Sequence, residues 1–322
     1  MTRMKRFRKQ IFARGTNRFL VLLSIALVIA LVLTIYIFAR PTSEAEPASP
    51  EYVFDDLGRL VAINGTPQRI VSLAPSNTEI LFALGLGDKV VGVTDWCNYP
   101  PEALEKEKVG GYVTPDIEKI VALNPDLILV AYGTPMEVIN TMVGLGLTVF
   151  GIKTTDLDDL LNDIKRVGEI TDKEVEAYAL TSEMAVGIKA VTDQTEELEQ
   201  RPRVFYIVGH EPSLWTAGSG TFIHELIEKG GGVNTCQNIT SYSEISIEYV
   251  LARDPEIIIA SEWSYDWAIN ASELASTNAS QTGRIYTLDD DLAQRPGPRL
   301  VEGLEWFAYF IHPEIFEEPE GS

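Results

Sequence analysis

The sequence predicts an α/β protein made of two similar lobes, each with a mostly parallel sheet. The main observation is an internal duplication: residues 117–131 read IEKIVALNPDLILVA, and residues 247–261 read IEYVLARDPEIIIAS. Five of the fifteen paired residues are identical. The second observation is the length of 322 residues, which is enough for about two domains.

Each copy of the duplication predicts a short helix, a loop and a buried strand. Apolar residues at i, i+3 and i+4 spacing open each copy, and a proline such as Pro125 cannot continue the helix. The apolar runs 127–130 and 257–260 do not alternate with polar residues. Such runs are typical of strands that are covered on both faces of a parallel sheet. Similar strand sequences precede the copies, at 69–76 and 203–210.

The charge is distributed unevenly along the chain. The net charge is -21, but residues 1–40 contain eight Lys or Arg and no acid. Residues 41–322 therefore contain 18 bases and all 47 acids, a net charge of -29. A body this acidic repels nucleic acid, so we expect no nucleic-acid partner.

The N-terminal residues predict a connection to a membrane. A basic tail at 1–18 precedes an uncharged run at 19–39, whose length of about 31 Å as a helix is enough to cross a bilayer. We expect the tail to stay in the cytoplasm and the rest of the chain to reach the extracytoplasmic face. Residues 40–52 have the Pro-, Ser- and acid-rich composition of a disordered spacer.

We expect the segment 19–39 to remain as an anchor, with a cleaved signal peptide as the alternative. The apolar run is longer than that of most signal peptides, and no A-x-A-like site lies between Ala39 and Pro50. No cysteine lies there either, which excludes a bacterial lipoprotein anchor at this position. The four Asn-x-Ser/Thr sequons, which begin at Asn64, Asn238, Asn270 and Asn278, are interpreted as chance occurrences.

The start of the body, residues 53–154, predicts an N-terminal lobe. A hairpin is expected around Gly58, because glycine tolerates turn dihedral angles. The strand RIVSLA is followed by a helix, for which Ser76 and Glu79 form a capping-box pattern. Gly85 is expected to end this helix.

The run RIVSLAPSNTEILFALGLGDKVVGV, followed by NYPPEA and VGGYVTPDIEKIVALNPDLILV, resembles the periplasmic binding proteins that feed ABC importers of vitamin B12, haem and iron siderophores. It is most similar to the cobalamin-binding members, from Val53 to Pro313. The resemblance implies a clamshell in which one long helix, here within 155–200, crosses from the first lobe to a second lobe at 201–322.

The same resemblance implies the function. The chain is expected to be a monomeric receptor that captures a corrinoid without changing it and delivers it to an ABC importer, made of a permease dimer and its ATPase. It implies no enzymatic activity and no cofactor apart from the transported ligand. An enzyme is disfavoured by the residues too, because His210, His224 and His312 have no metal-binding spacing. Neither a phosphate loop nor a G-x-S-x-G motif is present.

A corrinoid or a haem is a wide, mostly apolar ring with polar edges, so its cleft needs aromatic walls and a few placed polar groups. The resemblance places seven candidates at the cleft: Trp96, Tyr112, Tyr132, His210, Trp215, Tyr242 and Arg295. Tyr112 stands six residues before Glu118, and Tyr242 stands six residues before Glu248. Equivalent loops of duplicated lobes are expected to face each other across the cleft.

Glu118 and Glu248 begin the two duplicated helices, where a carboxylate is favoured by the helix dipole. The resemblance implies a second role, since relatives use one glutamate on each lobe to pair with arginine clusters of the permease. We therefore predict that both are permease-docking residues.

Three questions remain open from the residues. Haem would use a Tyr or His ligand and a ferric siderophore would use Arg and aromatic contacts, and Tyr112, His210 and Arg295 offer these groups. A tethered sensor without a permease is a further alternative. Cys97 and Cys236 could form a disulfide in an oxidising compartment, or they could be two free buried thiols.

Overall fold

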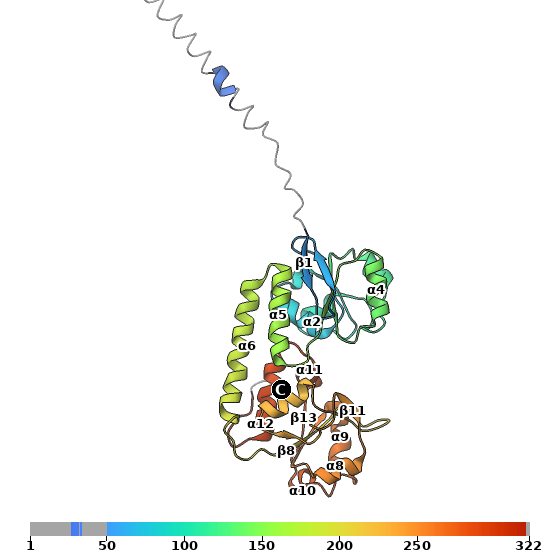
Figure 1. Ribbon diagram of the computed structural model, residues 1–322, viewed down its shortest axis with the longest axis vertical. Helices are drawn as coiled ribbons and strands as arrows, with labels where there is room; N and C mark the ends of the chain where they lie inside the picture. The colour runs from blue at the N-terminus through green and yellow to red at the C-terminus, as the bar shows by residue number, and fades with distance from the viewer. Residues whose placement is uncertain (1–26, 32, 34–49, 320–322) are drawn as a thin grey trace, which may run out of the picture. The chain divides into compact units, whose positions relative to one another are not determined.

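The computed structural model describes residues 27–31, 33 and 50–319, and Pro50–Ser322 form one compact unit (Figure 1). The basic tail at 1–18 and most of the predicted anchor (19–39) and spacer (40–52) lie outside the described residues. Within the described ranges, no helix has the length and apolar character needed to cross a membrane.

The strands of the compact unit are short. In chain order they are β1 (Glu51–Phe54), β2 (Leu60–Ile63), β3 (Ile70–Ser72), β4 (Val90–Val93), β5 (Glu107–Lys108), β6 (Leu127–Ala131), β7 (Val149–Ile152), β8 (Arg203–Ile207), β9 (Trp215–Ala217), β10 (Val233–Asn234), β11 (Tyr242–Glu244), β12 (Ile257–Ser261) and β13 (Ile285–Leu288).

The helices are α2 (Pro75–Ala83), α3 (Ile117–Ala122), α4 (Met136–Gly144), α5 (Leu157–Thr171), α6 (Glu174–Thr195), α7 (Phe222–Lys229), α8 (Ile247–Arg253), α9 (Glu262–Asn270), α10 (Asn278–Thr282), α11 (Asp290–Gln294) and α12 (Leu300–Ile311). A 3-10 turn at Gly87–Lys89 precedes β4, and another at Pro101–Glu105 precedes β5.

Two parallel sheets confirm the predicted α/β class. One has the strand order β5-β4-β3-β6-β7 and the other has the order β10-β8-β12-β13, and every neighbouring pair is parallel. The predicted hairpin is also present, because β1 and β2 pair antiparallel and Gly58 between them has a φ of 75°. A second antiparallel pair joins β9 and β11.

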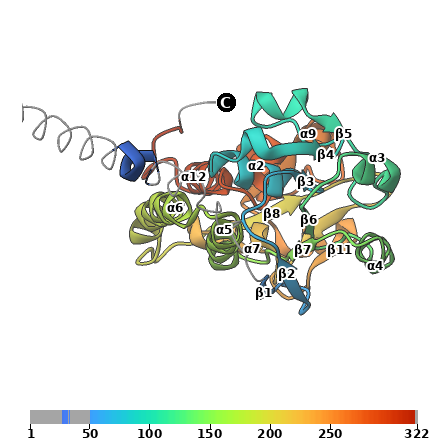
Figure 2. The same ribbon diagram turned by 90° about the horizontal axis from the view of Figure 1, so that it is seen from above.

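Each face of the first sheet is covered by helices, which explains its continuous apolar strands. Leu127 and Leu129 pack in a core cluster with residues of α2 and α5. The alternate residues Ile128 and Val130 pack in another cluster with residues of α3 and α4. Figure 2 shows α5 and α6 on one side of these strands and α3 and α4 on the other. Burial on both faces is the reason that polar residues do not alternate along β6.

The duplicated stretches fold alike, as α3 with β6 and as α8 with β12. In the first copy, the Arg69 guanidinium donates to the backbone carbonyls of Leu123, at 2.6 and 3.0 Å, and of Asn124, at 3.2 Å. The Asp126 carboxylate accepts from the backbone N–H groups of Gln68 and Arg69. The carbonyls at a helix C-terminus have no partner inside the helix, so Arg69 satisfies them from the neighbouring strand.

The second copy repeats this arrangement. The Arg203 guanidinium donates to the carbonyls of Arg253 at 3.1 Å and Asp254 at 2.8 Å, and the Glu256 carboxylate accepts from the Arg203 N–H at 3.0 Å. Asp254 has a left-handed φ of 43°, and its counterpart Asn124 has a φ of 46°. We call these two sets of contacts the arginine latches. The two lobes therefore share hydrogen bonds as well as sequence in the duplicated stretches.

The expectation of one long interlobe helix within 155–200 is correct only in part, because the stretch forms two helices, α5 and α6, of which the longer, α6, contacts the second lobe. Asp172 between them adopts the left-handed conformation, with φ 60°, which aspartate tolerates better than most residues and which ends a helix. A Cβ on Gly168 would lie 2.5 Å from the Ala177 Cβ, so the glycine lets the two helices pack closely at the turn.

The 22-residue helix α6 is the longer member of this pair, and it contacts α7 and α12 of the C-terminal lobe. Helix α5 contacts α2 of the N-terminal lobe. In Figure 1 the two helices run side by side. Leu300, Leu304 and Phe307 of α12 are fully buried in the same cluster as Ile164 of α5, so one apolar core continues from lobe to lobe.

A buried ion pair also connects the lobes. The Glu79 carboxylate on α2 accepts from the Arg299 guanidinium at 2.7 and 3.1 Å, and its side chain is 2% exposed. The expected capping box is therefore wrong. Helix α2 begins at Pro75 after Ala74, with no side-chain cap, and Glu79 points to the other lobe instead of back to the helix start.

Asp163 on α5 is a second buried carboxyl group. It is 4% exposed and accepts a hydrogen bond from the Thr154 hydroxyl at 2.7 Å. Burial raises its pKa from 3.8 to about 6, and the nearby Asp159 and Asp156 carboxylates act in the same direction, whereas the Thr154 bond lowers it.

Glu79→Ala should destabilise the protein by roughly 3–5 kcal/mol, because it leaves the Arg299 charge without its partner in a largely buried site. Urea unfolding measures this free energy. The exposed pair of Lys189 and Asp193 on α6 supplies the control, and Asp193→Ala should change the stability little. Equal losses in the two variants would show that the interlobe pair is no stronger than a surface pair.

Asp163→Asn should raise the free energy of unfolding at pH 7.5 by about 2 kcal/mol and have little effect at pH 3.5. The pKa of Asp163 is higher in the native state than in the unfolded chain. Ionisation of this carboxyl group therefore disfavours the native state increasingly from about pH 4 to pH 6. Denaturant unfolding at the two pH values tests this. The exposed Glu183 in the middle of α6 serves as control, since Glu183→Gln should change the stability little at either pH. A stabilisation that is the same at both pH values would contradict the titration.

Candidate ligand-binding cleft

A cavity of about 540 Å³ lies between the two lobes. Its walls include residues at or just beyond the carboxyl ends of parallel strands: Ala74 after β3, Ala131 of β6, Ile152 of β7 and Val208 after β8. The start of α7 lines it as well. In open α/β sheets, ligands bind beyond the carboxyl ends of the strands, so the fold places a binding site here.

Three of the predicted aromatic residues line this cavity: Tyr112, Tyr132 and Tyr242. Tyr112 and Tyr132 belong to the N-terminal lobe and Tyr242 to β11 of the C-terminal lobe, so the structure brings the loops of the two lobes together. The Tyr242 ring packs edge-on against Phe222, with centroids 6.4 Å apart. Desolvation raises the pKa of Tyr242, which keeps its hydroxyl neutral.

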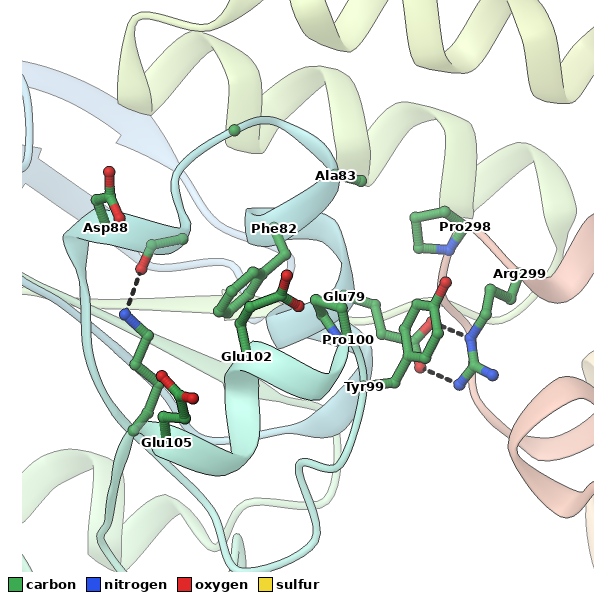
Figure 3. Close-up of a pocket in the computed structure, with 13 residues that line it drawn as sticks. Glu79, Phe82, Ala83, Asp88, Tyr99, Pro100, Glu102, Glu105, Pro298 and Arg299 are labelled. Carbon is green, nitrogen blue, oxygen red and sulfur yellow. Dashed lines mark hydrogen bonds and ion pairs between the residues drawn. The ribbon is translucent and has the colours of Figure 1, made fainter.

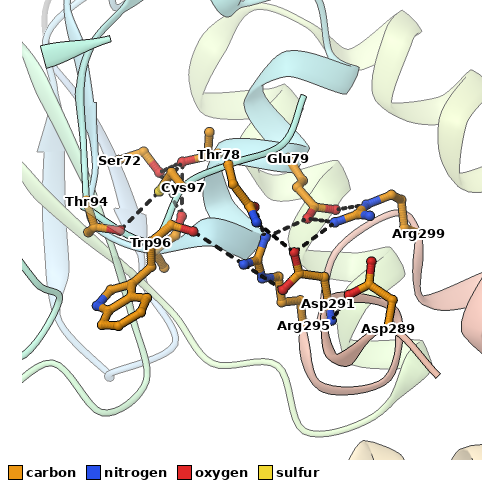
Figure 4. A network of polar contacts seen from close by, with 12 residues as sticks. Ser72, Thr78, Glu79, Thr94, Trp96, Cys97, Asp289, Asp291, Arg295 and Arg299 are labelled. Carbon is orange, nitrogen blue, oxygen red and sulfur yellow. Dashed lines mark hydrogen bonds and ion pairs between the residues drawn. The ribbon is translucent and has the colours of Figure 1, made fainter. Parts of the chain in front are cut away.

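Arg295 is the one lining residue with a formal charge among those that the structure describes. Its guanidinium contacts the Asp291 carboxylate at 2.6 Å, and it donates to the Asn98 side chain at 2.5 Å and the Trp96 carbonyl at 3.3 Å. It also lies 3.6 Å from Glu79. Figure 4 shows this network, in which Arg295 and Arg299 reach the first lobe from one loop of the second. Its charge is therefore largely balanced by protein groups.

The other predicted binding residues do not line the cavity. Trp96 is 67% exposed, and Figure 4 shows its indole directed away from the ion pairs. The Trp215 indole N–H donates to the Ser213 hydroxyl at 3.0 Å. His210 stacks on Trp267 at 5.1 Å between ring centroids. These three residues stay predicted contacts for a ligand larger than the cavity.

Several lining residues were not identified from the sequence. They are mostly neutral and polar, namely Ser76, Asn77, Thr154, Thr155, Thr221, Ser241 and Gln294. Three of them share a signal of position: Thr154 and Thr155 lie two and three residues after β7, and Ser76 lies four residues after β3. A search for polar residues beyond each predicted buried strand would have found these three.

A larger cavity of about 730 Å³ lies beside the Glu79–Arg299 pair (Figure 3). Its lining comes mainly from the first lobe, including Phe82, Tyr99 and Glu102. The Tyr99 ring stacks on the Arg299 guanidinium at 3.9 Å. None of the residues predicted to bind ligand lines it, and it does not lie at the strand ends, so we take the smaller interlobe cavity as the candidate site.

The predicted docking residues Glu118 and Glu248 are exposed in the first turns of α3 and α8. The N-cap of α3 is Asp116, whose carboxylate accepts from the Lys119 N–H at 3.0 Å. The Glu248 carboxylate accepts from its own N–H and from the Ser246 hydroxyl, which lowers its pKa. The N-cap of α8 is Ser246, whose hydroxyl accepts from the Tyr249 N–H at 3.3 Å, so in both helices the capping role belongs to another residue.

Cys97 and Cys236 are both buried and free. Of the two alternatives, a disulfide or two free buried thiols, the structure has the second. Cys97 lies near Thr78 and Thr94, with their hydroxyl oxygens 3.2 and 3.1 Å from its sulfur. Burial raises the pKa of Cys236. Among the described residues, no cluster of His, Cys, Asp or Glu could bind a metal ion.

Comparison with known proteins gives consistent matches. A family model described as periplasmic binding protein matches residues 70–292. The uncharacterized ABC transporter substrate-binding lipoprotein YvrC of Bacillus subtilis (strain 168) is 32% identical over 276 residues, which cover 84% of this chain and 88% of YvrC.

Two solved structures share the fold. The periplasmic vitamin B12 binding protein BtuF of Vibrio cholerae is 31% identical with a TM-score of 0.69, over 77% of this chain and 97% of that one. The periplasmic heme-binding protein RhuT from Roseiflexus sp. RS-1, in its apo form, is 26% identical with a TM-score of 0.71, over 77% of this chain and 99% of that one.

The matches cover both parallel sheets and the cleft between them, and the relatives are substrate-binding proteins, which confirms that the chain is not an enzyme. The chain belongs to the periplasmic binding protein family and is an extracytoplasmic solute-binding protein of an ABC transporter.

Proposed function

We propose that this protein captures a corrinoid in the interlobe cleft and delivers it to the permease of an ABC importer. Its residues 53–154 and 201–322 would form the two lobes and 155–200 the connection. The observation that carries the proposal is the lining of the cleft, which combines tyrosine rings with neutral polar groups and has one charged residue, Arg295, among the described residues.

The neutral lining favours a ligand with a neutral edge. Corrinoids carry carboxamide groups around the ring, whereas haem carries carboxylates and ferric siderophores are commonly anionic. A carboxylate in the cleft needs a cationic partner, and Arg295 is already paired with Asp291. The body outside the cleft, with a net charge of -29 for residues 41–322, repels anions further. The relative BtuF, which binds vitamin B12, supports the same choice.

The wider binding surface would include the exposed rings at the cleft entrance. Trp96 is placed by the backbone bond from Arg295, and Trp215 starts β9, which pairs with the strand that begins at Tyr242. His210 and Trp267 form a stacked pair that offers a flat polar surface. We assign these residues to the periphery of a corrinoid that is too wide for the cavity alone.

Delivery requires contact with the importer, and we assign it to Glu118 and Glu248. Both carboxylates are exposed and each stands on one lobe, so a permease dimer would engage both lobes at once through cationic side chains. We also propose that the segment 19–39 anchors the chain, with the body on the extracytoplasmic side of the membrane.

Cyanocobalamin should bind the full-length protein with one-to-one stoichiometry and a Kd of about 1 μM or lower, and haemin should bind more weakly. Calorimetry and quenching of tryptophan fluorescence measure both. Tyr112→Ala should weaken cyanocobalamin binding, and Tyr178→Ala on the outer face of α6, where Tyr178 is 72% exposed, should not. Tighter binding of haemin than of cyanocobalamin would sink the corrinoid assignment.

Replacing both Glu118 and Glu248 with alanine should reduce cobalamin uptake through the reconstituted importer at least about ten-fold, while the Kd for cobalamin stays unchanged. The control is Glu137→Ala, because Glu137 is likewise exposed in the first turn of its helix, α4. Normal uptake by the double variant would remove the docking role. A weaker Kd would instead show that the two glutamates act on the ligand site.

A further inference from the structure

Asn77 has an unusual environment for a buried amide. The residue is 1% exposed, yet neither its side-chain oxygen nor its side-chain nitrogen has a hydrogen-bond partner. It lies in the first turn of α2 and lines the interlobe cavity. A buried carboxamide without partners is costly, because it has lost its water without compensation.

The two polar side chains that follow Asn77 on α2, those of Thr78 and Glu79, both have hydrogen-bond partners within the protein. The Thr78 hydroxyl is within hydrogen-bond distance of two acceptors, the Ser72 hydroxyl at 2.8 Å and the Ala74 carbonyl at 3.1 Å. Glu79, the next residue, accepts two hydrogen bonds from Arg299. The contacts of these neighbours are visible in Figure 4. Among the described residues with unpaired buried polar side-chain atoms, Asn77 is the one that lines the interlobe cavity, and the others are Thr134, Arg201, Tyr249, Ser261 and Trp306.

A second buried asparagine shows what a structural amide looks like in this protein. Asn234 is fully buried, its side-chain nitrogen donates to the Ala217 carbonyl at 2.9 Å, and its oxygen accepts from the Cys236 N–H at 2.8 Å. Both asparagines are buried to the same extent. They differ in that Asn234 is bonded to its own fold and Asn77 is not.

The start of α2 offers further unpaired donors around Asn77. The N-cap Ala74 has no side chain that could accept from the first turn, and Pro75 occupies the first helical position. By contrast α7, whose start lines the same cavity, is capped by the Thr221 hydroxyl, which accepts from the His224 N–H at 3.2 Å. The cavity therefore has one capped helix start and one that is left open beside a free amide.

We propose that Asn77 is a specificity-determining residue that pairs with a carboxamide of the bound ligand. A carboxamide offers one donor and one acceptor that match the free oxygen and nitrogen of Asn77, so both atoms are satisfied at once. A carboxylate offers acceptors alone and leaves the Asn77 oxygen unpaired. The inference rests on the proposed function, and it names the edge of the corrinoid that the cleft selects.

The selectivity experiment uses the full-length protein with cyanocobalamin and with derivatives in which one peripheral carboxamide is hydrolysed to a carboxylate. The unmodified protein should prefer cyanocobalamin to at least one derivative by about ten-fold or more, since sites built to bond a polar group reject analogues that leave it unpaired. In Asn77→Leu, cyanocobalamin binding should weaken about ten-fold, and that preference should disappear. An unchanged preference in Asn77→Leu overturns the inference.

A ligand-free measurement provides a second, independent readout. Leucine has the same number of side-chain heavy atoms and the same branching as asparagine but no polar atoms, so Asn77→Leu should raise the unfolding temperature of the empty protein by about 2 °C or more. Asn234→Leu is the matched control and should lower it, because it breaks the hydrogen bonds of Asn234 with Ala217, His224 and Cys236. A similar loss in both variants would show that the Asn77 amide has a structural role and would overturn the proposal.

The outcomes separate this inference from the proposed function. If the unmodified protein binds cyanocobalamin and Asn77→Leu binds it equally well, the corrinoid assignment stands and the role of Asn77 is refuted. If the unmodified protein does not bind cyanocobalamin, both fail. Loss of affinity together with a raised unfolding temperature supports the inference, since a merely structural residue would lose stability and affinity together.

Discussion

The contact between Glu79 and Arg299 is the constraint on which the cleft depends. It connects the first helix of one lobe to the loop before the last helix of the other, and the same loop positions Arg295 at the cavity wall. A carboxylate with a 2% exposed side chain requires a partner, so this loop is fixed against α2. The cleft wall and the lobe junction are consequently built from one short segment, residues 295–299.

The surface of the body and the lining of the cleft differ in charge. Outside the cleft the body is strongly acidic, which repels anions. Inside it, the described lining has tyrosines, threonines, amides and one balanced arginine. Neutral polar groups can bond a neutral ligand without the desolvation cost of a buried charge. Selectivity in such a site comes from which donors and acceptors remain unpaired when the site is empty.

The sequence predicted the α/β class and the duplication, because these depend on local patterns such as buried strands and prolines. The cleft was expected from the family resemblance. The sequence did not predict the break at Asp172, since an acidic helical stretch has the same residue pattern whether one or two helices form. The capping-box pattern at Ser76 and Glu79 misled for a related reason: the tertiary partner Arg299 lies 220 residues away. Tyr112, Tyr132, Tyr242 and Arg295 reached the cavity, while Asn77 and Thr154 had no signal other than their place after a strand.

The arginine latches have a mechanical consequence. Each ties the C-terminal end of a short helix to the sheet of its own lobe: Arg69, before β3, bonds the end of α3, and Arg203, the first residue of β8, bonds the end of α8. Glu118 and Glu248 therefore cannot move independently of the sheets whose ends form the cleft. A hinge motion that opened one lobe away from the other would therefore change the distance between these two carboxylates. The spacing of two surface charges thus reports the opening of an internal space.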